Sequence, residues 1–235
     1  MARMTAIPLQ RDVHYPDSDG KPMAETDLHR DEMYDLIKAL DRRYRDAPDV
    51  YVSGNLFLYY TKGDPRAVVA PDVFLVKGVP KRSRRIYKLW EEGRPPSLVI
   101  ELTSDSSQDE DLSKKKPCYE RLGVEEYFLH DPYQDYLDPA LQGFRLVNGR
   151  YQRIPPEANG SLRSLTTGLL LRTEGKKLRL VDAATREPLP WSEELDAQMS
   201  RERSARQAAE ERADREAAAR RALEEELERL RRERH

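Results

Sequence analysis

The chain divides sharply in composition near residue 191. Residues 192–235 contain 13 acidic residues and 11 arginines, and they contain no glycine, proline or aromatic residue. Residues 1–191 hold the other 30 acidic and 30 basic residues, together with all of the glycines, prolines and aromatic residues. A segment with so little apolar surface cannot form a core of its own. The sequence therefore predicts one globular body of about 190 residues, which is large enough for a single core, followed by a charged tail.

Composition excludes several classes of protein. A net charge of −2 excludes a protein that coats nucleic acid by bulk positive charge, so binding to a polyanion would need a local patch. The single cysteine, Cys118, excludes a disulfide framework and a multi-cysteine zinc site. No apolar run approaches the ~20 residues that span a bilayer, and residues 1–8 are too short for a signal peptide. We therefore expect a cytoplasmic protein with no membrane association.

Hydrophobic periodicity and turn residues predict a mixed α/β body at residues 23–190, after an irregular lead-in at residues 1–22. Ser107 and Glu110 predict a capping box at the start of the second helix, and Gly123 stands beyond its end. The expected elements are, in order, a helix (24–45), strands (50–60, 67–76 and 97–103), a helix (108–122), a strand (125–130) and two added β-hairpins (143–154 and 169–181). This order of helix, three strands, helix and strand indicates an α/β mixed sheet and not an alternating, doubly wound fold.

The tail, residues 191–235, predicts one long charged helix with Ser192 as its N-cap. Leu223, Leu227 and Leu230 have the spacing of a coiled coil. Extending that register toward the N-terminus gives the core positions Leu195, Met199, Ala209 and Ala213, but also Arg206, Glu216 and Arg220. Two alternatives stay open: a coiled coil that joins a homodimer, or a solvated single helix.

Two acidic residues interrupt apolar strands. Glu101 lies in Leu98-Val-Ile-Glu-Leu102, a run typical of a strand covered on both faces, where a carboxylate is costly unless it is paired or binds a metal. Asp72 follows Pro71 inside the run 68–76, and proline marks a bulge or an edge that can direct the next side chain out of the sheet. The alternatives are a buried salt bridge for Glu101 and an ordinary turn for Asp72.

Lys115 falls in the middle of the apolar stripe of the second helix when residues advance about 100° each. A lysine that faces a core needs an anionic partner, and Asp72 and Glu101 are the natural candidates. The alternative is a pair with Asp111, one turn earlier on the same helix. That pair would not explain why Lys115 faces inward.

Glu25 and His29 lie four residues apart on the inner stripe of the first helix. They are candidates for a metal ligand and a residue that supports it. For His29 the spacing favours a partly buried helix end without a ligand role, while the role of Glu25 stays open.

Two carboxylates on neighbouring strands and a lysine can together hydrolyse a phosphodiester. The carboxylates of Asp72 and Glu101 would bind a hard divalent cation, Mg²⁺ or Mn²⁺. Such a cation lowers the pKa of a bound water and stabilises charge on a phosphoryl oxygen. Lys115 would orient or deprotonate the water, or stabilise the developing negative charge.

These residues resemble a known family. Pro71-Asp72 followed by Glu101-Leu-Thr103 resembles the bipartite motif of the PD-(D/E)xK nuclease superfamily, whose core has the same helix, three-strand, helix, strand order. Residues 97–104, 111–115, 119–124 and 126–132 are more closely similar to the Uma-type proteins of bacteria, a family classed as restriction endonucleases. The resemblance covers about residues 22–190. It implies a restriction-endonuclease-like core and an endonuclease that acts on DNA.

The sequence departs from the superfamily motif at Thr103, where the motif has a lysine. The resemblance implies that this lysine has moved to Lys115, on the following helix. It also implies that Glu25 is a further acid near the metal.

A basic segment, Lys81-Arg-Ser-Arg-Arg-Ile-Tyr-Lys88, places five bases in eight residues. In a nuclease Lys81, Arg82, Arg84, Arg85 and Lys88 are candidate contacts to backbone phosphates. The alternative is an ordinary solvated loop.

Three functions are therefore compatible with the sequence. The first is a magnesium-dependent DNA endonuclease that uses Asp72, Glu101 and Lys115. The second is a non-catalytic nucleic-acid-binding or adaptor protein that keeps the fold and oligomerises through its tail. The third is an inert body that carries a partner-docking helix.

Overall fold

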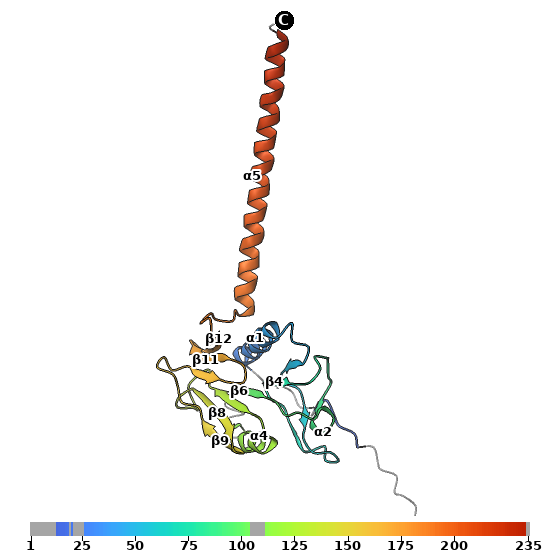
Figure 1. The fold of residues 1–235 in the computed structure, drawn as a ribbon, viewed down its shortest axis with the longest axis vertical. Coiled ribbons are helices and arrows are strands. Elements are labelled where there is room, and N and C mark those ends of the chain that lie inside the picture. Colours follow the sequence, from blue (N-terminus) through green and yellow to red (C-terminus); the bar gives the residue numbers. More distant parts are fainter. Residues whose placement is uncertain (1–12, 19, 21–25, 104–110, 234–235) are drawn as a thin grey trace, which may run out of the picture. The chain divides into compact units, whose positions relative to one another are not determined.

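A computed structural model describes residues 13–18, 20, 26–103 and 111–233 of the chain. The chain forms two compact units, Met1–Leu189 and Pro190–His235. The first unit, called the body below, is a mixed α/β fold, and the second consists mainly of one long helix, α5 (Ser192–Glu233). Figure 1 shows both units coloured along the sequence.

A six-stranded mixed sheet forms the centre of the body, with the strand order β1-β4-β6-β7-β8-β9. Its strands are β1 (Val50–Ser53), β4 (Val73–Lys77), β6 (Leu98–Leu102), β7 (Glu126–His130), β8 (Leu141–Val147) and β9 (Arg150–Arg153). β6 and β7 are parallel, and every other neighbouring pair in this sheet is antiparallel. The mixed α/β class predicted from the sequence is confirmed.

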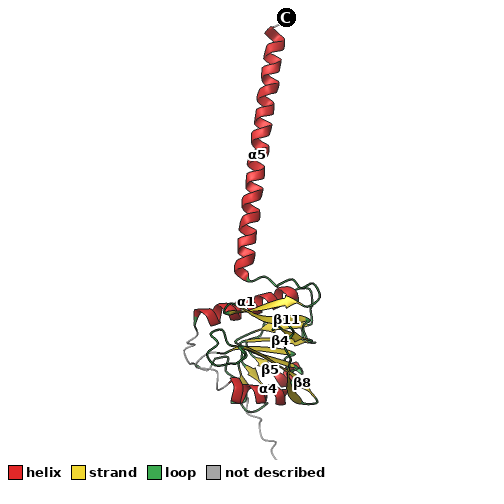
Figure 2. Ribbon diagram, turned by 90° about the vertical axis from the view of Figure 1, so that its left-hand side faces the viewer, coloured by secondary structure: helices red, strands yellow, loops and turns green. Residues whose placement is uncertain are grey.

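Helices cover both faces of the central sheet. Figure 2 shows α1 (Asp27–Arg43) and α4 (Lys116–Leu122) on opposite sides of it. Leu36 and Leu40 of α1 pack with Leu98 and Ile100 on one face. The strands β10 (Leu162–Ser164), β11 (Leu169–Glu174) and β12 (Lys177–Asp182) contribute to the same cluster. On the other face, Tyr119 of α4 packs with the aromatic side chains of β4 and β7. Strand β6 is consequently buried on both faces, as its continuous apolar run predicted.

The two longest predicted strands are each divided. The segment 50–60 forms β1 and then β2 (Leu58–Tyr59), and the segment 67–76 forms β3 (Val68–Val69) and then β4. The chain leaves the central sheet at Gly54 and Asn55, and the Asn55 N–H donates to the Pro71 carbonyl at 2.8 Å. Pro71 has no N–H with which to continue a ladder. A small sheet with the order β3-β2-β5 results, in which β5 (Tyr87–Lys88) leads into the short helix α2 (Leu89–Glu92).

The two predicted hairpins are confirmed. β8 and β9 turn at Asn148 and Gly149, whose φ angles of 51° and 76° suit a tight hairpin. β11 (Leu169–Glu174) and β12 (Lys177–Asp182) turn at Gly175. The sequence did not predict β10 (Leu162–Ser164), which adds to this second hairpin, because three residues are too few to show a periodicity.

Helix α5 begins one residue earlier than predicted. Ser192 is the first helical residue, and the backbone N–H of Trp191 donates to Glu194 Oε2 at 2.8 Å. Glu194 therefore caps the helix start from within the first turn, as in a capping box. In the described ranges, no helix has the length and apolar character needed to cross a bilayer.

The backbone at Gly54 packs closely against the backbone at Asp72. A Cβ atom at Gly54 would lie 2.0 Å from the Asp72 carbonyl oxygen and 2.6 Å from Ile37 Cδ1. We expect Gly54→Ala to lower the free energy of unfolding by about 3 kcal/mol, measured by urea denaturation, because backbone must move to admit the methyl group. Gly63→Ala is the control, since nothing lies within 4 Å of its Cβ position and only its φ of +89° adds strain. An unchanged midpoint for Gly54→Ala would contradict this packing.

Candidate active site

Glu101 is a fully buried carboxylate on the α4 side of β6, with a side-chain exposure of 0%. Lys115 Nζ donates to its Oε2 at 2.9 Å, and the Tyr119 hydroxyl donates to its Oε1 at 2.6 Å. The backbone N–H of Asp72 also points at Oε2, at 3.3 Å. Burial and the neighbouring Glu101 charge raise the pKa of Tyr119 well above its usual value, so this hydroxyl stays protonated and donates. Both oxygens of Glu101 are thus satisfied inside the core.

Asp72 lies beside Glu101, directly before β4. Its Oδ2 accepts the backbone N–H of Leu102 at 2.8 Å, and His29 Nε2 lies 3.5 Å from the same oxygen. Burial raises the pKa of Asp72, but the hydrogen bond from His29, the charge of Lys115 and the Leu102 N–H together hold that pKa below its usual value of 3.8. A carboxylate at this position is therefore ionised at neutral pH.

Lys115 comes from a short π-helical turn, η1 (Asp111–Lys115), that runs directly into α4. Pro117 follows η1 directly and lacks the N–H that a helical residue at this position would donate to the preceding turn. Turns of π-helix are rare and are frequent at functional sites. This local geometry places the Lys115 ammonium group on Glu101, which confirms the predicted inward orientation. The predicted capping box of Ser107 and Glu110 lies outside the described residues.

A cavity of about 400 Å³ opens beside these groups. Lys115 lines it together with apolar and aromatic residues of the small sheet and the lead-in, among them Phe57, Tyr59 and Val69. The Lys115 side chain is 14% exposed, whereas Glu101 behind it is sealed from solvent. Lys115 is therefore the charged group through which a molecule in this cavity would meet the carboxylates.

The structure brings together three of the four residues proposed from the sequence for the metal site and catalysis. Asp72, Glu101 and Lys115 are in mutual contact or electrostatic range, while Glu25 lies outside the described residues. Among the residues that are described, no group of three or more His, Cys, Asp or Glu side chains is arranged to hold a metal ion. The two carboxylates supply hard oxygen ligands, which suits Mg²⁺, a cation commonly held by one or two protein carboxylates with water and substrate phosphate.

Two residues of the site were missed or undervalued by sequence reasoning. His29 was favoured as a simple helix end, and it is indeed buried near the start of α1, but its imidazole also faces Asp72. Tyr119 was not singled out as a site residue from the sequence, and its hydroxyl donates to Glu101. Its position one helical turn after Lys115 was the available signal, because residues four apart share a helix face.

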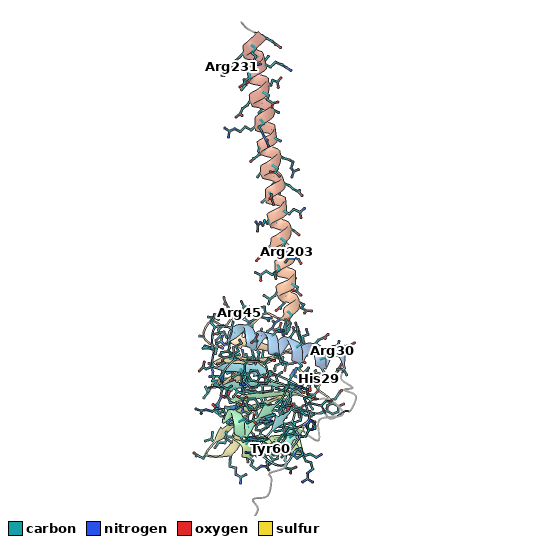
Figure 3. The ribbon with its side chains drawn as sticks, turned by 90° about the vertical axis from the view of Figure 1, so that its right-hand side faces the viewer. His29, Arg30, Arg45, Tyr60, Arg203 and Arg231 are labelled. Atoms are coloured by element: carbon teal, nitrogen blue, oxygen red, sulfur yellow. The ribbon has the colours of Figure 1, made fainter. Side chains whose placement is uncertain are left out.

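A second buried contact between polar side chains involves α1. Glu32 Oε1 is 2.8 Å from His130 Nδ1, both side chains are almost fully buried, and the backbone N–H of Leu178 donates to the same oxygen at 2.7 Å. Glu32 follows His29 by three residues, so α1 presents two polar side chains to the strand ends. This pair connects α1 to β7 and β12 and thereby fixes the helix that carries His29 (labelled in Figure 3).

The family described as "Uma2: Putative restriction endonuclease" matches residues 2–174. The chain belongs to the Uma2 family. The comparison with curated proteins found no match. A solved structure described as a putative nuclease belonging to DUF820, from Anabaena variabilis ATCC 29413, is similar over 63% of this chain and 76% of that chain. The two share 15% sequence identity, with a TM-score of 0.46.

In this Uma2 protein the basic segment 81–88 is neutralised by the body itself. Each of the five proposed phosphate contacts has an acidic partner: Lys81 with Asp41, Arg82 and Arg84 with Glu92, Arg85 with Asp17, and Lys88 with Glu91. The Arg84 side chain is 3% exposed, and its guanidinium lies 4.2 Å from the centre of the Tyr51 ring.

The proposal of a phosphate contact is therefore wrong for Arg84, which serves the packing of the body. The sequence could not show this, because it does not reveal that the chain turns back through α2 and places Glu92 on the Arg84 guanidinium. Arg82 and Arg85 are exposed, and their proposed role stays a prediction.

The Arg84–Glu92 pair makes the stability of this Uma2 protein depend on pH. Hydrogen bonds from Arg84 lower the pKa of Glu92 from its usual 4.5, against the opposing effect of burial. The folded pKa lies below the unfolded one, so this contribution is complete above pH 4.5 and is lost as the pH falls through the folded value. In the wild-type protein, protonation of Glu92 lowers the free energy of unfolding between about pH 5 and pH 3. We expect this decrease to be smaller in Glu92→Gln, measured by urea denaturation at several pH values. The neighbouring Glu91→Gln should keep the wild-type dependence, and an unaltered profile for Glu92→Gln would contradict the assignment.

Proposed function

We propose that this Uma2 protein is a metal-dependent endonuclease that hydrolyses phosphodiester bonds of DNA. The observation that carries the proposal is the convergence of Asp72, Glu101 and Lys115 from three separate segments, with Lys115 lining a cavity. Packing alone does not require two buried carboxylates and a lysine that reaches a cavity, since buried ion pairs contribute little net stability. The description of the family as restriction endonucleases supports DNA as the substrate.

The order of elements supports a restriction-endonuclease-like core within the body. α1, β1, β4, β6, α4 and β7 follow one another as helix, three strands, helix and strand, apart from the small inserted sheet. Asp72 precedes the second of these strands and Glu101 lies in the third, which is the arrangement of the PD-(D/E)xK motif. Lys115, on the helix that follows, takes the place of the lysine that Thr103 replaces.

Asp72 and Glu101 would hold Mg²⁺ or Mn²⁺. Bound there, the cation would activate a water molecule and stabilise charge on the phosphoryl oxygens. Hydrolysis forms a bond from the water oxygen to phosphorus and breaks the bond from phosphorus to the leaving oxygen, which takes up a proton.

Lys115 donates to Glu101 from the cavity side, so its ammonium group is placed to stabilise the negative charge that develops on the phosphate. Tyr119 and the Leu102 N–H act as positioning groups, because they hold the two carboxylates in place. His29 has the same role toward Asp72.

Cleavage of supercoiled plasmid by the purified full chain tests the proposal. We expect nicking that needs Mg²⁺ or Mn²⁺ and stops with a chelator. Asp72→Asn, Glu101→Gln and Lys115→Met should each lower the rate by about 100-fold or more, because each removes a charge that acts on the reacting phosphate. Lys114→Ala is the matched control: Lys114 is exposed beside Lys115, and its loss should leave the rate within about twofold of wild type.

Thermal unfolding of each variant shows whether it keeps its fold. Folded wild-type protein that cleaves no DNA or RNA with either cation would favour the non-catalytic adaptor instead. Activity that survives in Asp72→Asn and Glu101→Gln alike would place the chemistry elsewhere.

A further inference from the structure

The apolar side chains of α5 gather toward its two ends. Met199, Leu223, Leu227 and Leu230 are exposed, and no residue of α5 is buried in the described chain. Figure 3 shows side chains extending from all sides of the helix. Exposed leucines at coiled-coil spacing favour burial against a second helix, and the charge pattern between them can select that helix.

Four charged residues occupy core positions of the same heptad register. Counting from Leu223, Leu227 and Leu230 gives Leu195, Met199, Ala209 and Ala213 as further core positions. The remaining core positions between residues 195 and 230 are Glu202, Arg206, Glu216 and Arg220. Their signs follow the order acid, base, acid, base along the helix. A coiled coil with such residues in its core is stable only if each one meets an opposite charge.

A parallel pairing in register does not meet this condition. It places each core residue opposite its own copy, so that Arg206 faces Arg206 and Glu216 faces Glu216 of the second chain. Like charges enclosed between two helices repel strongly, because the space between them is poorly hydrated. A parallel homodimer of α5 is therefore disfavoured at four of its layers.

An antiparallel pairing centred on Glu211 meets the condition at every charged layer. The facing residues are then Leu195 with Leu227, Met199 with Leu223, Glu202 with Arg220, Arg206 with Glu216, and Ala209 with Ala213. Every apolar residue in these layers meets an apolar one, and every acid meets an arginine. At the end of the overlap, Leu230 lies opposite Ser192.

The charges also fix the register. A shift of one heptad in either direction places Arg206 opposite Leu223 or Ala209, and Glu202 opposite Leu227 or Ala213. Each shift leaves charged side chains without partners in the core, which strongly disfavours it. Charged core residues that match in only one arrangement act as determinants of register and orientation.

We propose that α5 is an antiparallel dimerisation helix that pairs with α5 of a second copy of this chain in this register. The leucines and Met199 at the two ends supply most of the affinity by apolar burial. The arginine–glutamate layers supply orientation and register. Arg220 also has an intrahelical partner, Glu224, at 3.0 Å, and an exposed pair of this kind is weak enough to be exchanged.

The pairing has a geometric consequence. The two Ser192 residues would lie about 57 Å apart, at a rise of about 1.5 Å per residue over the overlap. A parallel dimer would hold them side by side. The two bodies would therefore be attached at opposite ends of the coiled coil, an arrangement that suits independent action on separate segments of a polymer. The inference concerns α5 alone and does not rest on nuclease activity.

Charge reversal in the full chain tests the orientation, with sedimentation equilibrium as the measurement of the dimer Kd. Arg206→Glu and Glu216→Arg should each raise the Kd at least about tenfold, because each creates two like-charge layers. The double variant Arg206→Glu/Glu216→Arg should return to within about threefold of wild type, since the opposite charges then face each other again.

The control is Arg215→Glu, the same change on the outer face of the helix, which should leave the Kd within about threefold of wild type. A double variant as weak as the single ones would overturn the antiparallel pairing, because a parallel dimer keeps its like-charge layers. A wild-type chain that stays monomeric at all concentrations would overturn the proposal as a whole.

Disulfide trapping gives an independent test. In a Cys118→Ala background, Ala209→Cys and Ala213→Cys are made as two separate proteins that differ in mass through a tag. The antiparallel register predicts a disulfide-linked product only when the two proteins are mixed. Linked products from each protein alone would show a parallel pair, and no linked product from any sample would exclude this register.

Discussion

The buried carboxylate of Glu101 is the constraint on which the arrangement of the body depends. A charge enclosed on both faces of a sheet must be compensated by its surroundings. Lys115, Tyr119 and the Asp72 N–H provide that compensation, and they come from three different elements. The need to satisfy one carboxylate therefore places the end of η1, the first turns of α4 and the entry to β4 around a single point. The same arrangement produces two acids and a lysine beside a cavity.

Much of the arrangement around Glu101 could be predicted from charged residues that stand at apolar positions of a strand or helix. Glu101 in an apolar strand and Lys115 on an apolar stripe each require a partner, so their meeting was foreseeable. The contribution of the Tyr119 hydroxyl was not, because a tyrosine on an apolar stripe already satisfies the pattern by packing. His29 was undervalued for a similar reason, since a helix start can bury a histidine without using it. The pairing of the basic segment 81–88 could not be predicted, because Asp17 and Asp41 are distant in sequence and Glu92 reaches Arg84 only through the fold of α2.

The element boundaries show where local pattern stops being informative. The runs 50–60 and 67–76 each read as one strand, yet each divides where the Asn55 N–H binds the Pro71 carbonyl. That contact joins two segments distant in sequence, and no periodicity within either segment reveals it. The division places Asp72 at the re-entry to the central sheet, where its backbone N–H contacts Glu101. The charged tail is the opposite case, since its composition alone predicts a helix, and its heptad pattern is the basis of the proposed pairing with a second copy.

The most direct measurement of the central claim is the position of Mn²⁺ in crystals of the full chain, located by anomalous scattering. The account predicts one peak between the carboxylates of Asp72 and Glu101, near the Lys115 ammonium group, and its loss in crystals of Glu101→Gln. A peak elsewhere in the body, or no peak at this position at saturating Mn²⁺, would contradict the assignment of these residues as the metal-binding centre of a nuclease.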